Sequence, residues 1–142
     1  MAISARNQVV GVVSSVADGA VNDEVELTLP GGAKLVAIVT RSSKTAMGLE
    51  SGKEAIALIK APWVILASEN SGFVFSARNQ FPGEVTSLQR GAVNTTAHIK
   101  TDNGPVLISV ITNEGADEMG LQVGSRVLAL VKASSVMLAV RA

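Results

Sequence analysis

Five polar side chains recur in this chain at a constant separation of 72 residues, and each of them can donate hydrogen bonds or carry positive charge. The first copies are Ser4, Arg6, Asn7, Thr40 and Lys60, and the second copies are Ser76, Arg78, Asn79, Thr112 and Lys132. No acidic residue is kept with them. A set of hydroxyl, amide, guanidinium and ammonium donors suits a small tetrahedral oxyanion, which accepts hydrogen bonds on every side. One Arg and one Lys would balance a dianion.

Small residues accompany the donors, and they would let the backbone come close to a ligand and offer N–H groups to it. Taken singly, each donor has an equally good structural explanation, because Ser and Asn before a strand often bond to their own backbone and an exposed Arg is usually solvated. Lys60 and Lys132 are the most informative positions. Each ends an apolar strand-like segment, where a lysine must reach solvent or meet an anion.

The repeated donors belong to an internal duplication. The pentamer Ser-Ala-Arg-Asn-Gln stands at 4–8 and again at 76–80, and about 26 of 64 positions aligned at this offset are identical. The duplication predicts two units, residues 1–69 and 73–142, joined by a short polar linker. A unit of this size buries only about 60% of its unfolded surface, so we expect the two to pack together or with further chains.

Composition excludes several kinds of protein. The chain has no cysteine, so it has no thiolate nucleophile, thiolate metal site or disulfide. Its formal net charge is zero, which gives no electrostatic attraction for nucleic acid. No apolar run approaches the roughly 20 residues that span a bilayer, and the first residues do not resemble a signal peptide. The sequence therefore indicates a soluble, cytoplasmic protein without membrane or nucleic-acid partners.

The apolar pattern predicts five short strands and one helix in each repeat. In the first repeat the strands are expected at 8–16, 21–29, 34–39, 54–59 and 63–66, with a helix at 42–49 capped by Ser42. Residues 30–32 form the turn of a hairpin. Three strands, a helix and two strands is the order of an OB-type Greek-key barrel. We therefore predict an all-β protein with one short helix per repeat, built as two tandem OB-fold-like five-stranded barrels.

These motifs resemble the molybdate-binding Mop domain. The resemblance rests on the repeated SARNQ, on GAVN about fifteen residues later, on the TxxS segment at Thr40 and on KAPW or KASS after the fourth strand. It covers nearly the whole chain, and two Mop domains in tandem are similar to the cytoplasmic molybdate-binding proteins called molbindins. The resemblance implies an OB-like barrel, molybdate or tungstate as ligand at boundaries between domains or subunits, and a homotrimer that stores or buffers molybdenum.

The resemblance also implies which residues bind. The first type of pocket is expected to use Ser4, Ala5, Arg6, Asn7, Thr40, Ser43, Lys60 and Ala61, with Ser76, Ala77, Arg78, Asn79, Thr112, Gly115, Lys132 and Ala133 as the second copy. A second type of pocket near a symmetry axis is expected to use Ala20, Val21, Asn22, Ala92, Val93 and Asn94.

The copies differ at two places near these residues. Ser43 becomes Gly115, which removes a hydroxyl donor, and Pro62-Trp63 becomes Ser134-Ser135. We therefore expect the two copies to bind with unequal affinity.

Three other functions are alternatives. An enzyme is disfavoured because His98, the only histidine, has no nucleophile or metal-ligand pattern around it. An oligonucleotide-binding OB-fold protein would need stacking aromatics and a basic groove, whereas Phe73, Phe75 and Phe81 cluster around the linker, where packing between the barrels explains them. The sensing module of a molybdate-responsive regulator is the nearest alternative, although no helix-turn-helix segment precedes Ser4.

Overall fold

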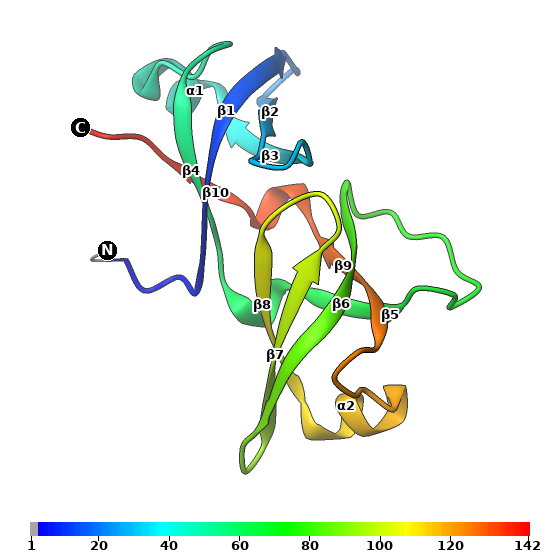
Figure 1. Ribbon diagram of the computed structural model, residues 1–142. Helices are drawn as coiled ribbons and strands as arrows, with labels where there is room; N and C mark the ends of the chain where they lie inside the picture. Colours follow the sequence, from blue (N-terminus) through cyan, green and yellow to red (C-terminus); the bar gives the residue numbers. More distant parts are fainter. Residues whose placement is uncertain (1–2) are drawn as a thin grey trace.

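The computed structural model describes residues 3–142, which form two curled five-stranded sheets with two short α-helices (Figure 1). The first repeat contains β1 (Asn7–Ala17), β2 (Asn22–Thr28), β3 (Lys34–Thr40), α1 (Arg41–Met47), β4 (Glu54–Ile59) and β5 (Ile65–Ser68). The second repeat contains β6 (Asn79–Arg90), β7 (Asn94–Thr101), β8 (Val106–Thr112), α2 (Asn113–Met119), β9 (Arg126–Val131) and β10 (Met137–Ala139). The predicted all-β class and the order of three strands, a helix and two strands are confirmed.

Helix α1 begins one residue earlier than predicted, and its cap is Thr40 instead of Ser42. The Thr40 side chain accepts a hydrogen bond from the backbone N–H of Ser43, and Gly48 ends the helix in the left-handed conformation. Thr112 and Gly120 do the same for α2. The repeated threonine thus satisfies one of the free N–H groups of the first helical turn, which is a structural reason for its presence in both repeats.

The fifth strand of the first repeat was predicted to begin at Trp63, and this is wrong. Residues Ala61–Trp63 form a 3₁₀ turn, closed by a hydrogen bond from the Trp63 N–H to the carbonyl of Lys60, and β5 begins at Ile65. Pro62 favours such a turn because its ring fixes φ and it has no N–H to leave unpaired. A matching 3₁₀ turn, Ala133–Ser135, precedes β10 in the second repeat.

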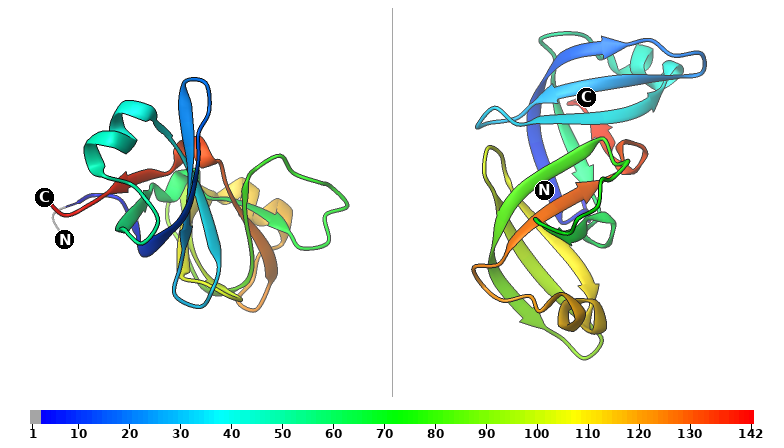
Figure 2. Two further views of the ribbon diagram at one scale, coloured as in Figure 1. Left: turned by 90° about the horizontal axis from the view of Figure 1, so that it is seen from above. Right: turned by 90° about the vertical axis from the view of Figure 1, so that its right-hand side faces the viewer.

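The last strands of the two repeats are exchanged. β10 pairs with β4 in the sheet of the first repeat, in the order β10-β4-β1-β2-β3, and β5 pairs with β9 in the order β5-β9-β6-β7-β8. Figure 2 shows the C-terminal segment, in red, entering the blue and cyan sheet. The division into units 1–69 and 73–142 stays a prediction about the sequence. In space, each sheet takes four strands from one repeat and one from the other.

One hydrophobic core joins both repeats. Its members include Val25 and Leu35 in one sheet and Val85 and Leu107 in the other, all buried within the same cluster. Val, Leu, Ile and Ala supply almost all of it, as the near absence of aromatic residues requires. Only part of the aromatic prediction holds: Phe81 packs in this core, but Phe73 is 76% exposed on the linker.

Two buried asparagines hold the sheets together. The amide of Asn79 accepts a hydrogen bond from the Val36 N–H at 2.7 Å and donates one to the Val36 carbonyl at 2.8 Å. Asn7 makes the same pair of bonds with the N–H and carbonyl of Ile108, at 2.7 and 2.8 Å. Val36 and Ile108 lie on β3 and β8, the outermost strands of the two sheets. Each side chain therefore supplies the donor and acceptor that a further strand would have supplied.

The equivalent hairpin turns of the two repeats also meet. The Ala33 N–H donates to the carbonyl of Asn103 at 2.9 Å. Gly31 lies against the same carbonyl with φ of 95°, and a Cβ at this position would come within 2.8 Å of the oxygen. A side chain would therefore be strained both by the backbone conformation and by the contact.

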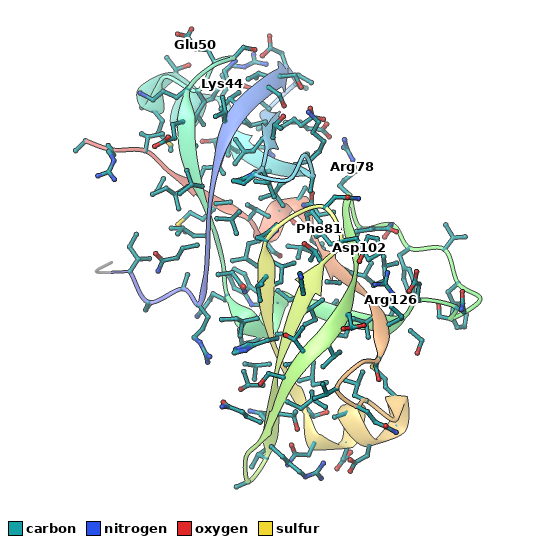
Figure 3. The ribbon with its side chains drawn as sticks, in the orientation of Figure 1. Lys44, Glu50, Arg78, Phe81, Asp102 and Arg126 are labelled. Carbon is teal, nitrogen blue, oxygen red and sulfur yellow. The ribbon has the colours of Figure 1, made fainter. Side chains whose placement is uncertain are left out.

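Arg126 fastens the linker to the second sheet. Its guanidinium binds both carboxylate oxygens of Asp102 at 2.9 and 2.6 Å and Glu69 at 2.7 Å, and Figure 3 shows Arg126 beside Asp102. These bonds lower the pKa of Asp102 and raise that of Arg126. The repeat-one counterpart of Arg126 is Glu54, so this fastening exists in one copy only.

Replacement of Asn79 by alanine should lower the free energy of unfolding by about 2 kcal/mol, because the N–H and carbonyl of Val36 lose their partners. Urea unfolding at fixed protein concentration measures this difference. Asn70→Ala, at an exposed linker position, is the control and should change it by less than about 0.5 kcal/mol. Equal stability of the two variants would contradict the role of Asn79.

Candidate oxyanion site

A cavity of about 360 Å³ gathers most of the candidate residues of the second repeat. Its lining includes Ser76, Ala77, Arg78, Lys132 and Ala133. Strand pairing explains the arrangement. Asn79 at the start of β6 lies opposite Val131 at the end of β9, so the residue before one and the residue after the other come together at the same edge of the sheet. Residues 54 positions apart thereby place a guanidinium and an ammonium group around one hollow.

The other repeat supplies part of the wall. Ile38 of β3 and Ile65 of β5, both from the first repeat, line the same cavity. Phe75, Leu130 and Ser134 complete the lining. Ile38 lies there because the turn Ala133–Ser135 packs against β3. The candidate site is therefore built from both repeats of one chain. Its apolar walls would limit the room for water around a bound ion, and its polar rim would supply the donors.

The first-repeat candidates follow the same register. Asn7 lies opposite Ile59, which brings Arg6 beside Lys60 at the edge of the other sheet. Ser4, Arg6 and Lys60 are exposed, and Ala61 is buried.

Thr40 and Ser43 line a different cavity, of about 290 Å³, with Trp63 of their own repeat and with Ser134 and Ser135 of the other. The Nζ atom of Lys60 lies 5.7 Å from the centre of the Trp63 ring. This cavity adjoins the Arg78 cavity, because Ile38 and Ser134 line both. In both cavities the candidate residues come from one repeat, and residues of the other repeat that were not candidates complete the wall.

The second-type candidates lie at the turns between the first two strands of each repeat, and all of them are exposed. Asn22 pairs with Thr40, and Asn94 pairs with Thr112. Ala92 and Val93 line an open cavity of about 410 Å³ with Thr112 and Arg90. Ala20 and Val21 lie at the equivalent turn of the first repeat.

Gly115 donates its N–H to the Thr112 hydroxyl oxygen at 3.0 Å. It therefore keeps the helix cap although it lacks the hydroxyl of Ser43.

Asn7 and Asn79 stand apart from the other candidates. Both side chains are buried, and both amides are taken up by the bonds to Ile108 and Val36. Their contacts give them a structural role: each fixes the backbone immediately after an arginine of the candidate site. Binding of a ligand by these two amides stays a prediction.

The two arginines have different surroundings. Arg78 Nη1 lies 2.6 Å from Glu24 Oε1 on β2, and Figure 3 shows Arg78 at the start of β6 reaching toward the first repeat. Within residues 3–142, no ion pair of Arg6 is found. The lysines differ as well. Lys60 lies against the Trp63 ring, whereas Lys132 has no such ring, because Ser135 stands in the place of Trp63.

A buried acidic group near the first-repeat turn was not among the sequence candidates. Asp23 is fully buried, accepts a hydrogen bond from the Gly19 N–H at 3.0 Å, and forms ion pairs with Arg41 and Lys44, both at 3.2 Å. The Gly19 N–H, Arg41 and Lys44 lower the pKa of Asp23 from 3.8 to about 2. The sequence carried a signal for it, because the alternating pattern of β2 puts Asp23 on the inward face with Val25.

The second repeat replaces this charged group by neutral residues. Thr95 stands in the place of Asp23 and donates a hydrogen bond to Asn113, which stands in the place of Arg41. The turn that carries Ala20 to Asn22 is therefore held by a buried carboxylate. The turn that carries Ala92 to Asn94 has a neutral bond in that place, together with an exposed ion pair between Arg90 and Asp117 at 2.8 Å.

The described part of the chain, residues 3–142, contains no group of three or more His, Cys, Asp or Glu side chains placed to hold a metal ion. His98 lies in β7 opposite Ser87 and Ile108. Within the same residues, no helix is long and apolar enough to cross a membrane. The fold and the donor set define a protein with two tandem OB-like barrels and pockets suited to small oxyanions.

Comparison with known proteins identifies the family. The TOBE domain matches the chain twice, at residues 3–66 and 76–138. A crystal structure of the cytoplasmic molybdate-binding protein ModG with molybdate bound is 44% identical, with a TM-score of 0.94 over 99% of this chain and 100% of the ModG chain. The chain therefore belongs to the TOBE domain family, as a tandem pair.

Two curated relatives are longer than this chain. The molybdenum-pterin-binding protein MopA of Rhodobacter capsulatus is 43% identical over 139 residues, and the molybdenum transport protein ModE of Herbaspirillum seropedicae is 39% identical over 141 residues. These alignments cover 98% and 99% of this chain but 52% of each relative. The chain thus spans about half the length of the curated relatives it matches.

Replacement of Asp23 by Asn should lower stability near neutral pH, and the difference from the unaltered protein should shrink as the pH falls from about 4 to about 2. Folding lowers the pKa of Asp23, so its carboxylate stabilises the fold fully above the unfolded pKa and loses that effect as the folded group takes up its proton. Urea unfolding across this pH range measures the difference. A difference that stays constant with pH would contradict the assignment.

Proposed function

We propose that this protein binds molybdate, and tungstate by the same donors, reversibly and without chemical change of the ion. The cavity that brings Ser76, Arg78 and Lys132 together carries the proposal, with the close match to molybdate-bound ModG as independent support. Molybdate is a tetrahedral dianion without a proton near neutral pH, so it accepts hydrogen bonds and offers none. A guanidinium, an ammonium and a hydroxyl group supply what it requires.

Phosphate and sulfate make useful contrasts. Phosphate keeps a proton near neutral pH and would be served by a carboxylate that accepts it, whereas the cavity lining contains no Asp or Glu and the nearby carboxylate of Glu24 is paired with Arg78. Sulfate has the same charge and shape as molybdate, so only the size of the pocket separates the two. We propose a binding function in storage and buffering of molybdenum in the cytoplasm, with no catalytic step.

Titration calorimetry of the whole chain with sodium molybdate should give saturable binding, at least about tenfold tighter than with sulfate or phosphate. Arg78→Ala should weaken molybdate binding, because a bidentate donor is lost from the cavity. Glu118→Gln, exposed on α2, is the control and should bind like the unaltered protein. Absence of saturable molybdate binding would contradict the proposed function.

We further propose that the protein is a homotrimer. The resemblance to molbindins suggests this state, and the outer face of the first sheet supports association. Val10, Val12 and Met137 are exposed there by 44%, 45% and 66%. Strand pairing sets Val10 opposite Ile56, Met137 opposite Leu58 and Val12 opposite Glu54. The counterparts of Val10 and Val12 in the second sheet are Pro82 and Glu84, so the exposed valine pair exists in one sheet only.

Sedimentation equilibrium should give a mass about three times the chain mass of 14.6 kDa. Val12→Glu, which copies the residue of the second repeat, should weaken association because a charge would be buried in the contact. Val123→Glu, at an exposed position before β9, is the matched control. A monomer mass for the unaltered chain would refute the trimer.

A further inference from the structure

We propose that Glu24 sets the anion affinity of the Arg78–Lys132 cavity by competing with the ligand for the Arg78 guanidinium. This inference rests on the proposed function, because it concerns the strength with which the same cavity binds an oxyanion. It makes Glu24 an affinity-determining residue although it belongs to neither the repeated donors nor the cavity lining.

The geometry places the carboxylate beside the cavity. Arg78 lines the cavity, and its Nη1 atom lies 2.6 Å from Glu24 Oε1. Glu24 pairs with Ile38 across the β2–β3 hairpin, and Ile38 also lines the cavity. Glu24 therefore lies next to the wall on the first-repeat side, where its negative charge acts on both Arg78 and an anion.

The competition is built into one copy of the repeat. The counterpart of Glu24 is Thr96, and that of Arg78 is Arg6, for which the described residues provide no ion-pair partner. Arg6 is thus available to an anion. Arg78 must either bind the anion and Glu24 together or release the Glu24 carboxylate when the anion binds. This is a second source of inequality between the copies, separate from the change of Ser43 to Gly115.

The expected size follows from the exposure of the pair. The Arg78 and Glu24 side chains are 51% and 40% exposed, so solvent screens the pair and an anion can replace the carboxylate readily. Exposed pairs of this kind correspond to a change of about two- to fivefold in an equilibrium constant. Repulsion between the carboxylate and a dianion acts in the same direction, and added salt weakens both effects.

The test is titration calorimetry of the whole chain with sodium molybdate at low and high sodium chloride. Glu24→Gln, and Glu24→Thr as a copy of the second repeat, should tighten the weaker class of sites about two- to fivefold at low salt. The gain should shrink at high salt. Glu26→Gln removes the same charge two residues along β2, where the carboxylate accepts a hydrogen bond from Ser14, and should leave the isotherm unchanged.

Reciprocal variants locate the effect. Thr96→Glu should weaken the class of sites that contains Arg6, and Lys132→Ala should erase the class that Glu24→Gln tightens, whereas Lys60→Ala should retain it. Unchanged or weaker binding by both Glu24 variants would overturn the inference and would show that the ion pair positions Arg78 for the ligand or has no effect on binding. Thermal unfolding of each variant confirms that the chains compared are folded.

The outcomes separate this inference from the proposed function. If the unaltered protein binds no molybdate, the proposed function fails. If it binds molybdate and the Glu24 variants bind no more tightly, the function stands and only the role of Glu24 fails.

Discussion

The closure of each sheet by the opposite repeat is the constraint on which the rest of this structure depends. A strand at the edge of a sheet leaves its N–H and carbonyl groups without partners. Here the edge strands β3 and β8 meet the amides of Asn79 and Asn7, each of which supplies one donor and one acceptor. The exchange of β5 and β10 ties the same two bodies together by backbone pairing. The two repeats consequently share one core.

This constraint also builds the candidate site. Asn79 follows Arg78 directly, so the bonds from Asn79 to Val36 hold the arginine against the first sheet and within reach of Glu24. The exchanged strand β10 draws the turn before it against β3, which adds Ile38 to the wall around Arg78 and Lys132. Pockets made in this way need residues from both repeats, and a single repeat would leave them open on one side.

The two copies have kept the fold while their charges diverged. Most buried apolar positions remain apolar in both, because a change of volume or polarity in the shared core is costly. Where Ala37 and Leu29 are replaced by Ser109 and Thr101, the buried hydroxyls donate hydrogen bonds to the carbonyls of Val64 and Pro105. At exposed positions solvent screens the exchange of a charge, so the alignment pairs Glu24 with Thr96 and Glu54 with Arg126. Asp23 is an exception, because it is a charged residue at a buried position. Its carboxylate occurs in the first copy alone, where Arg41 and Lys44 form ion pairs with it.

The sequence by itself determined the strand and helix order and the duplication, because alternation, turn residues and a fixed offset can be read without the fold; its set of anion donors stays a prediction. The sequence analysis placed the helix cap at Ser42 and the start of β5 at Trp63, and both positions are wrong by two residues. Near each boundary, more than one residue can serve as the cap or as the first residue of the strand. Only the tertiary structure decided that β5 and β10 change places and that Thr40 and Ser134 line the same cavity. The last strands carry the same apolar pattern, Ile65-Leu66-Ala67 and Met137-Leu138-Ala139, so this local pattern does not distinguish between the two sheets and long-range packing decides which sheet each strand joins.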